Sequence, residues 1–163
     1  MTEPASAPTS ERLWAMADDV ASTTGPGQVT RDYNRDLVSH YRQHGGKLPP
    51  GVDEMPVILI GMTSARSGKK RTVPLLFIDV GPLTYIAATR GGTSVNPLWF
   101  DDLVANPGIR VECGDSVYDA TAVVLEGAER DKIWAEFEKQ IPLFQQYQAG
   151  TDRVIPVIEL RPT

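Results

Sequence analysis

The sequence predicts a single α+β domain built on a small antiparallel β-barrel with short flanking helices. About six segments are rich in β-branched and apolar residues, and most of them come in pairs joined by short Gly-containing turns, as in hairpins. Helical patterns interrupt these pairs without regular alternation, which argues against a doubly wound parallel sheet. The 163 residues, 41% of them apolar and 23% charged, suffice for one buried core.

The first 30 residues are expected to form a flexible segment outside the domain, which we place at residues 31–163. Residues 1–10 are rich in Pro, Ala, Ser and Thr, a composition typical of disorder. Residues 11–21 have apolar side chains at helical spacing. This short helix either packs on the domain or associates weakly with a membrane, although Asp18 and Asp19 count against an anionic surface.

The first half of the domain is expected to contain one helix and three strands. Aromatic and apolar residues recur every four positions across 31–44, and the pair Gly45-Gly46 ends this helix. Two apolar runs then flank a basic loop, and a third strand follows the second across a turn at Gly81-Pro82. The three strands are expected at residues 55–63, 72–80 and 84–90.

The second half is expected to contain a further hairpin, a last strand and three helices. Asn96 is placed to cap a helix that has Pro97 at its first position. The hairpin turns at Gly114-Asp115, and Pro142 ends a longer amphipathic helix. Because Pro156 cannot donate to a ladder, the last strand is expected at an edge or a bulge. The expected strands are 108–114, 116–126 and 153–160, and the expected helices are 97–105, 128–141 and 143–148.

Composition and charge narrow the possible functions. The chain has 16 basic and 21 acidic residues, whereas general nucleic-acid binding requires a broad basic face, so no nucleic-acid partner is expected. The single cysteine, Cys113, permits no internal disulfide. His40 and His44 lie one helical turn apart without a third ligand cluster, so no metal is expected. With no apolar span and no secretory signal, we expect a cytoplasmic protein, or one peripheral to the membrane.

The most unusual feature is a cluster of cations at residues 63–74, TSARSGKKRTVP, between two apolar runs. It is not a nucleotide phosphate loop, because six residues rather than four separate Gly61 from Gly68-Lys69, and a strand rather than a helix follows. Two interpretations remain open. The loop binds a small polyanion, with the backbone N–H groups at Ser67-Gly68 and the arginines directed toward it, or it is a solvated hairpin tip.

A second stretch, ATRGGTSVNPLWF at 88–100, favours the ligand interpretation. Arg90 and Gly91-Gly92 follow a strand and lead into a helix N-terminus, an arrangement that suits anions. Trp99 and Phe100 offer flat apolar faces to a ring, although core packing explains Trp99 equally well. The two stretches together suit a ligand with an anionic tail and a planar ring system.

Several motifs resemble the deazaflavin-dependent nitroreductase family, actinobacterial oxidoreductases that use coenzyme F-420. They are SARSGKKRTVP, AATRGG followed by NPLWF, and TDRVIPVIELRP near the C-terminus, and the similarity extends from about residue 31 to 163. The resemblance implies a split β-barrel like that of the flavin-mononucleotide-binding pyridoxamine oxidases. It also implies that the basic loop holds the cofactor's phosphate and oligoglutamate tail.

The resemblance further implies which residues contact the cofactor, by their positions in these motifs. They are Ala65, Arg66 and Ser67 in the loop, Arg71, Thr72, Val73, Pro74, Leu75 and Leu76 along the next strand, Ala87, Ala88, Thr89 and Arg90 after the third strand, and Leu98, Trp99, Phe100, Asp101 and Asp102 at the helix start. Ala65 departs from the family, which usually has a cation there. A branch of the family has three tyrosines where this chain has Ile141, Phe144 and Tyr147.

The resemblance implies hydride transfer from C5 of the reduced deazaflavin to an electron-poor small molecule such as a quinone, enone or nitroaromatic. The cofactor carries the chemistry, and the protein orients it and excludes water. Tyr147 is the expected proton donor, and Trp14 and Phe144 are expected to line the acceptor side. Two alternatives remain: a flavin-mononucleotide-dependent reductase on the same fold, and a non-catalytic deazaflavin carrier.

Overall fold

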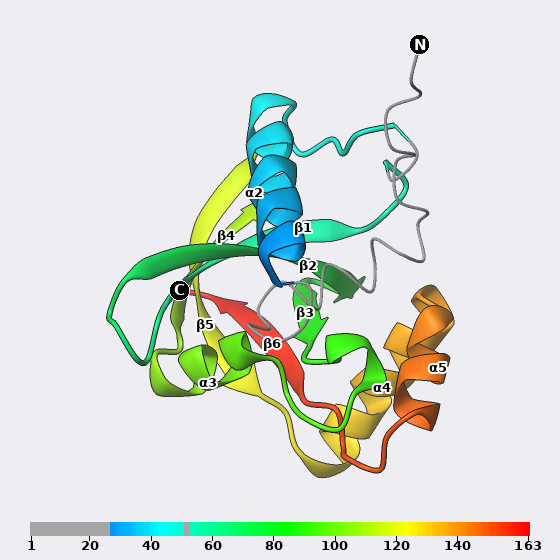
Figure 1. Ribbon diagram of the computed structural model, residues 1–163. Helices are drawn as coiled ribbons and strands as arrows, with labels where there is room; N and C mark the ends of the chain where they lie inside the picture. Colours follow the sequence, from blue (N-terminus) through cyan, green and yellow to red (C-terminus); the bar gives the residue numbers. More distant parts are fainter. Residues whose placement is uncertain (1–26, 51–52) are drawn as a thin grey trace.

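The computed structural model describes residues 27–50 and 53–163, and the side chains from residue 34 onward. Six antiparallel strands close into a barrel in the order β1-β2-β3-β6-β5-β4, with helices against its outside and one end (Figure 1). This confirms the predicted α+β class and the antiparallel barrel. The N-terminal segment 1–26, with its expected short helix and Trp14, lies outside the described residues.

The strands follow the predicted order, and the two predicted hairpins are confirmed. β2 pairs with β3 and β4 pairs with β5, each antiparallel. The bounds are β1 (Val57–Thr63), β2 (Lys70–Val80), β3 (Leu83–Ala87), β4 (Gly108–Cys113), β5 (Ser116–Val124) and β6 (Val157–Pro162). β6 pairs with both β3 and β5, so it is an interior strand of the barrel and the expected edge position is wrong.

The helices also correspond to the predicted segments, with shifted ends. They are α2 (Gly27–Gln43), α3 (Leu98–Ala105), α4 (Gly127–Gln140) and α5 (Leu143–Ala149), with a 3-10 turn, η1, at Arg90–Gly92. α2 contacts β2, α4 contacts β2, β6 and α5, and α3 contacts β1 and β5. Figure 1 shows α4 and α5 together on one side of the barrel and α3 at a separate place on it.

Apolar residues form two cores, because strand side chains alternate between the two faces of the sheet. The inner core fills the barrel and includes Ile60, Leu75 and Val111, with Trp99 and Leu103 of α3 closing it. The outer core lies between the barrel and helices α2, α4 and α5. Its members include Leu37, Tyr41, Leu59, Leu76, Trp134, Phe137 and Phe144.

Two predicted boundaries are wrong for the same reason, a long-range contact. The last strand begins at Val157 rather than at residue 153, since Arg153 directs its side chain to the loop after β3. Pro156 precedes the strand, and its carbonyl accepts from the Ala88 N–H at 2.9 Å. α3 is capped by Pro97 rather than Asn96, whose Oδ1 accepts instead from Arg153 Nη1 at 2.8 Å.

The barrel is split along β2. Residues 70–76 of this strand pair with β1, whereas residues 77–80 pair with β3. Since β3 ends at Ala87, no strand in the described part of the chain pairs with the other edge of residues 70–76. This open edge starts at the basic loop, and it confirms the split character of the predicted barrel.

Candidate functional site

The basic loop is a compact turn between β1 and β2 that is closed by Ser64. The Ser64 N–H donates to Lys69 O at 2.9 Å, and the Gly68 N–H donates to Ser64 O at 2.9 Å. Ser64 Oγ accepts from the N–H of Ser67 at 3.2 Å. The expectation that the N–H groups at Ser67-Gly68 turn toward an oxyanion is therefore wrong, because the loop itself uses both. An anion here would have to be bound by side chains.

Asp102 on α3 anchors this loop. Its Oδ1 accepts from the Ala65 N–H at 2.9 Å, and its Oδ2 lies 3.6 Å from Arg71 Nη1. The Asn106 side chain, one turn later, donates to Thr63 O at 3.3 Å. A buried carboxylate repels an anionic ligand, so Asp102 organises the loop and orients Arg71 rather than binding a polyanionic tail.

A cavity of about 500 Å³ lies between the loop and the first turn of α3. Six of the residues singled out from the sequence line it, together with Ser64: Ala65, Arg66, Arg71, Leu98, Asp101 and Asp102. Arg66 is exposed and Arg71 is half-buried. The cavity thus has two guanidinium groups at the end of the open β2 edge, where they can fork onto phosphate or carboxylate oxygens.

Beyond Arg71, β2 offers a ligand its backbone rather than its side chains. Val73 and Leu75 are each 1% exposed and belong to the inner core, and Leu76 packs in the outer core. Pro74 is buried, and Thr72 Oγ1 accepts from Arg42 Nη2 at 3.3 Å. A planar ring that lies along this strand would therefore meet the polar groups of the unpaired edge.

The loop after β3 borders the same edge from the other side. Ala87, Ala88 and Thr89 are buried, and Thr89 Oγ1 finds no hydrogen-bond partner among the described residues. Buried hydroxyls without a partner are rare and costly, so this atom is suited to a ligand's polar group. Arg90 is half-buried and has a positive φ of 45°. The orphaned hydroxyl, the open edge and the nearby cations fit a ring with an anionic tail.

The aromatic residues expected at the site lie mainly in the cores. Trp99 is 0% exposed in the inner core, so its ring presents no face to the 500 Å³ cavity, and Phe100 packs against the same cluster. Phe144 is 1% exposed and stacks on Phe137 with ring centroids 5.1 Å apart. In this structure Phe144 therefore contributes to the outer core rather than to an open acceptor pocket.

Tyr147, the expected proton donor, lies on α5 directly beside the turn at residues 90–92. A Cβ at Gly92 would lie only 2.5 Å from Tyr147 O, so the two backbones are in close contact. The Tyr147 side chain is 6% exposed and packs on Phe144. The fold thus brings α5 to the loop after β3, but keeps the tyrosine largely covered.

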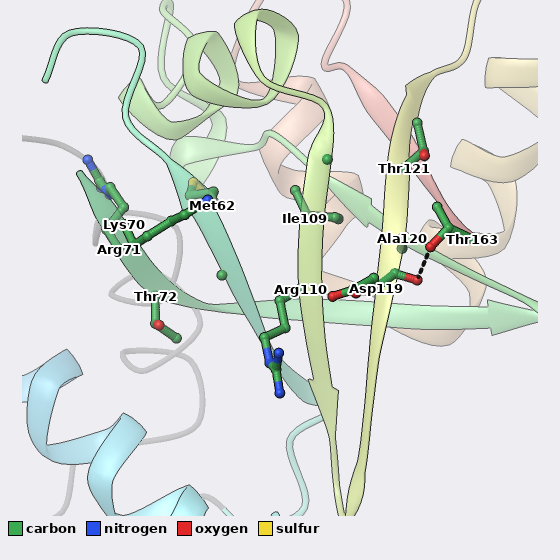
Figure 2. A pocket seen from close by; sticks show the side chains of 12 residues that line it. Met62, Lys70, Arg71, Thr72, Ile109, Arg110, Asp119, Ala120, Thr121 and Thr163 are labelled. Carbon is green, nitrogen blue, oxygen red and sulfur yellow. Dashed lines mark hydrogen bonds between the residues drawn. The ribbon is translucent and has the colours of Figure 1, made fainter. Parts of the chain in front are cut away.

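A larger cavity of about 680 Å³ is lined by residues of β1, β2, β4 and β5, and the predicted cofactor residues Arg71 and Thr72 are among them (Figure 2). Because Gly61 has no side chain, the Arg110 side chain can pack closely against β1. A Cβ at residue 61 would lie only 3.3 Å from Arg110 Cβ. Figure 2 shows the Arg110 guanidinium extending away from Asp119, the residue opposite it on β5. Lys70, Arg71 and Arg110 line this cavity together with the Asp119 carboxylate, so it also carries cationic groups.

Other reactive groups lie away from these cavities. Burial, with a smaller effect of the nearby Asp79 carboxylate, raises the pKa of the Cys113 thiol on β4, so it stays protonated at neutral pH. His40 and His44 stack on each other at 3.9 Å between ring centroids. Across residues 27–50 and 53–163, no three His, Cys, Asp or Glu side chains are grouped to hold a metal ion. None of the helices described is long and apolar enough to cross a membrane.

Sequence reasoning missed Arg153 as a site residue. Its guanidinium donates four hydrogen bonds to the loop at residues 88–96, although 57 or more positions separate the partners. The one available signal was its place in the TDRVIPVIELRP motif, which resembles the family.

Comparisons with known proteins identify the family of the chain. A candidate F420H(2)-dependent quinone reductase of Mycobacterium tuberculosis is 33% identical over 108 residues, which are 66% of this chain and 91% of that protein. A second protein of this organism, named F420H(2)-dependent quinone reductase, is 29% identical over 126 residues, 74% of this chain and 83% of its own.

A solved structure of an F420-H2-dependent reductase, FDR-A, superposes with a TM-score of 0.61 at 39% identity. The superposition covers 65% of this chain and 94% of that structure. Residues 33–162 match the family model described as F420H(2)-dependent quinone reductase. The chain therefore belongs to the F420H(2)-dependent quinone reductase family.

Proposed function

We propose that this protein binds the deazaflavin F420 along the open edge of β2 and uses it to reduce quinone-like acceptors. Three features together carry the proposal: the cavity with the Arg66 and Arg71 guanidinium groups, the unpaired backbone of residues 70–76, and the buried Thr89 hydroxyl. Homologues named as F420H(2)-dependent quinone reductases support the same cofactor and acceptor class.

Each part of the site would hold a different part of the cofactor. Arg66 and Arg71 would bind the phosphate and the first carboxylates of the tail, with the exposed Lys69 adding charge from the loop. The backbone of residues 72–76 and the Thr89 hydroxyl would bind the polar edge of the ring. When bound, the reduced deazaflavin supplies the hydride, and the protein's task is to orient it and to exclude water.

Reduction of a quinone also requires a proton at the acceptor oxygen. Tyr147 is the proposed donor, because α5 places it against the turn at residues 90–92 that borders the ring site. A phenol can donate directly or through one water. Tyr147→Phe should lower kcat with a quinone while leaving the Kd of F420 unchanged. An unchanged kcat would show that Tyr147 only packs in the outer core.

The surface beside the site suits a lipophilic acceptor. Val95, Leu98 and Val154 are 53%, 41% and 69% exposed, and Leu98 also lines the 500 Å³ cavity. Asn96 and Arg153, the neighbours of the two valines, are hydrogen-bonded to each other, so two loops that are held together carry this apolar surface. We propose that it meets the apolar chain of a quinone at the cytoplasmic face of a membrane.

Turnover measurements test the function directly. Purified protein should consume reduced F420 in the presence of a quinone, and a panel of enones and nitroaromatics would define the acceptor range. Val154→Ser should raise KM for a long-chain quinone more than for a short-chain one. Tight binding of F420 without turnover on any acceptor would indicate a carrier rather than an enzyme.

A further inference from the structure

Arg153 connects the loop between α5 and β6 to the loop that follows β3. All three nitrogens of its guanidinium donate hydrogen bonds to that second loop. The acceptors are Thr93 O at 2.8 Å from Nε, Thr89 O at 2.6 Å from Nη2, and Ala88 O at 3.1 Å and Asn96 Oδ1 at 2.8 Å from Nη1. One side chain therefore holds both ends of the segment 88–96.

This segment contains one residue in a strained backbone conformation, Arg90. Arg90, Gly91 and Gly92 have consecutive positive φ angles of 45°, 65° and 79°. Glycine adopts this left-handed conformation readily, whereas a residue with a Cβ, here Arg90, is strained in it. Within the turn, the Gly92 N–H donates to Thr89 O at 2.9 Å and the Thr93 N–H to Arg90 O at 3.3 Å. Such a conformation persists only where surrounding contacts impose it.

Arg153 is itself held on a rigid support. Its carbonyl accepts from Gln148 Nε2 at 2.9 Å, and Gln148 Oε1 accepts from Arg130 Nη2 at 3.1 Å. Arg130 is buried, donates twice to Ile155 O and lies 4.9 Å over the Trp134 ring. The position of the Arg153 backbone is therefore set by α4 and α5.

Arginine is the residue that this contact requires. Its planar guanidinium carries five N–H donors in a fixed fork, so it can bind several carbonyls that lie in different directions. Lysine has three donors on one nitrogen at the end of a flexible stem. An Arg153→Lys change keeps the charge but cannot span acceptors at both ends of the segment.

We infer that Arg153 is a positioning residue for the cofactor, which acts by fixing Ala88, Thr89 and Arg90 against the open edge of β2. The inference rests on the proposed function, because its consequence is the affinity for the deazaflavin ring. The position of the Thr89 hydroxyl depends on its own backbone, whose carbonyl makes the shortest of the four Arg153 bonds, at 2.6 Å. Loosening this contact would displace the group that is suited to the ring.

Binding measurements on the full chain test this assignment. We expect Arg153→Lys to raise the Kd of F420 at least tenfold, measured by cofactor fluorescence. The Kd of a tail-less deazaflavin, which has the ring and ribityl chain without phosphate, should rise by the same factor. Loss of the basic-loop cations should instead affect only the tailed form. A change confined to the tailed form in Arg153→Lys would overturn the inference.

Arg130→Lys is the matched control. Arg130 also bonds the segment that carries Arg153, at Ile155 O, but it makes no bond to residues 88–96 in the part of the chain described. Its replacement should lower the thermal midpoint but raise both Kd values less than Arg153→Lys does, because the four bonds from Arg153 to residues 88–96 remain. An equal loss of affinity in Arg130→Lys would show that general stability of the segment, not the Arg153 contact, determines binding.

A milder variant and a cofactor-free measurement keep the test decisive if Arg153→Lys does not fold. Asn96 is exposed, and Asn96→Ala removes one of the four acceptors, so both Kd values should rise about threefold. Amide hydrogen exchange at Gly92 and Thr93 should accelerate in Asn96→Ala and Arg153→Lys, and it should accelerate less in Arg130→Lys than in Arg153→Lys. Unchanged exchange and affinity in the folded variants would refute the assignment. A wild-type protein that binds neither deazaflavin would instead refute the proposed function.

Discussion

Removing Arg71 tests whether the basic loop binds a ligand or only stabilises the fold. Arg71 Nη1 lies 3.6 Å from Oδ2 of Asp102, whose side chain is 9% exposed, whereas that of Arg71 is 35% exposed. Asp102 Oδ1 also accepts from the Ala65 N–H. Arg71→Ala therefore leaves a nearly buried carboxylate without its cation, and the variant should lose both stability and affinity.

The size of the stability loss follows from this geometry. Removing one partner of a fully buried ion pair costs about 3–5 kcal/mol. This pair is longer than a hydrogen bond and one-third exposed on the arginine side, so solvent screens it and we expect about 1–2 kcal/mol. Asp102→Asn in the same background keeps an oxygen for the Ala65 N–H and removes the charge. The free energy of unfolding should then return to within about 0.5 kcal/mol of the wild type.

Affinity should respond differently from stability. The guanidinium contact to the cofactor tail is absent in both variants, so the Kd of F420 should stay several-fold above that of the wild type in Arg71→Ala/Asp102→Asn. Arg66→Ala with Arg71→Ala should raise this Kd at least tenfold, about 1.4 kcal/mol. Urea unfolding and fluorescence titration measure the two quantities on the same samples. Full recovery of affinity together with stability would show that Arg71 serves only the fold.

Three further predictions concern other parts of the molecule. Gly92→Ala should destabilise the protein by about 2 kcal/mol or more, because the new Cβ would lie 2.5 Å from Tyr147 O and the φ of residue 92 is +79°. The loss should appear as a lower urea midpoint. An unchanged midpoint would contradict this close contact. Burial raises the pKa of the Tyr41 phenol and of the Cys113 thiol, so the folded state holds these protons more tightly than the unfolded state. The free energy of unfolding should therefore be level up to about pH 8 and fall as the pH rises further, with a smaller fall in Tyr41→Phe. Cys113 should react with iodoacetamide at pH 8 more slowly than an unfolded control, and an equal rate would contradict its burial.

Much of the fold could be predicted because the relevant signals are local. The turns at Gly81-Pro82 and Gly114-Asp115 lie between adjacent apolar runs, so both hairpins follow from short stretches of sequence. Residues 64–71 and 98–102 form one cavity, and motif resemblance placed six of its members at the site. The closure of the barrel by β6 was not predicted, since Pro156 appeared to belong to the last strand and in fact precedes it.

The remaining differences come from contacts between distant segments. Asn96 has the right residue type to cap α3, but its side chain is used by Arg153, 57 positions away. The Ser67 and Gly68 N–H groups are used by Ser64 within the loop, which composition alone does not reveal. Trp99 fits both a ring contact and a core position, and only packing against the inner core decides in favour of the latter.

The proposed site fits a deazaflavin with an anionic tail better than a flavin with one phosphate. Titration of the purified full chain with F420 and with flavin mononucleotide, at low and at high salt, tests this preference. We expect a Kd for F420 at least tenfold below that for flavin mononucleotide, with a difference that shrinks as salt screens the tail. Equal or tighter binding of flavin mononucleotide would contradict it.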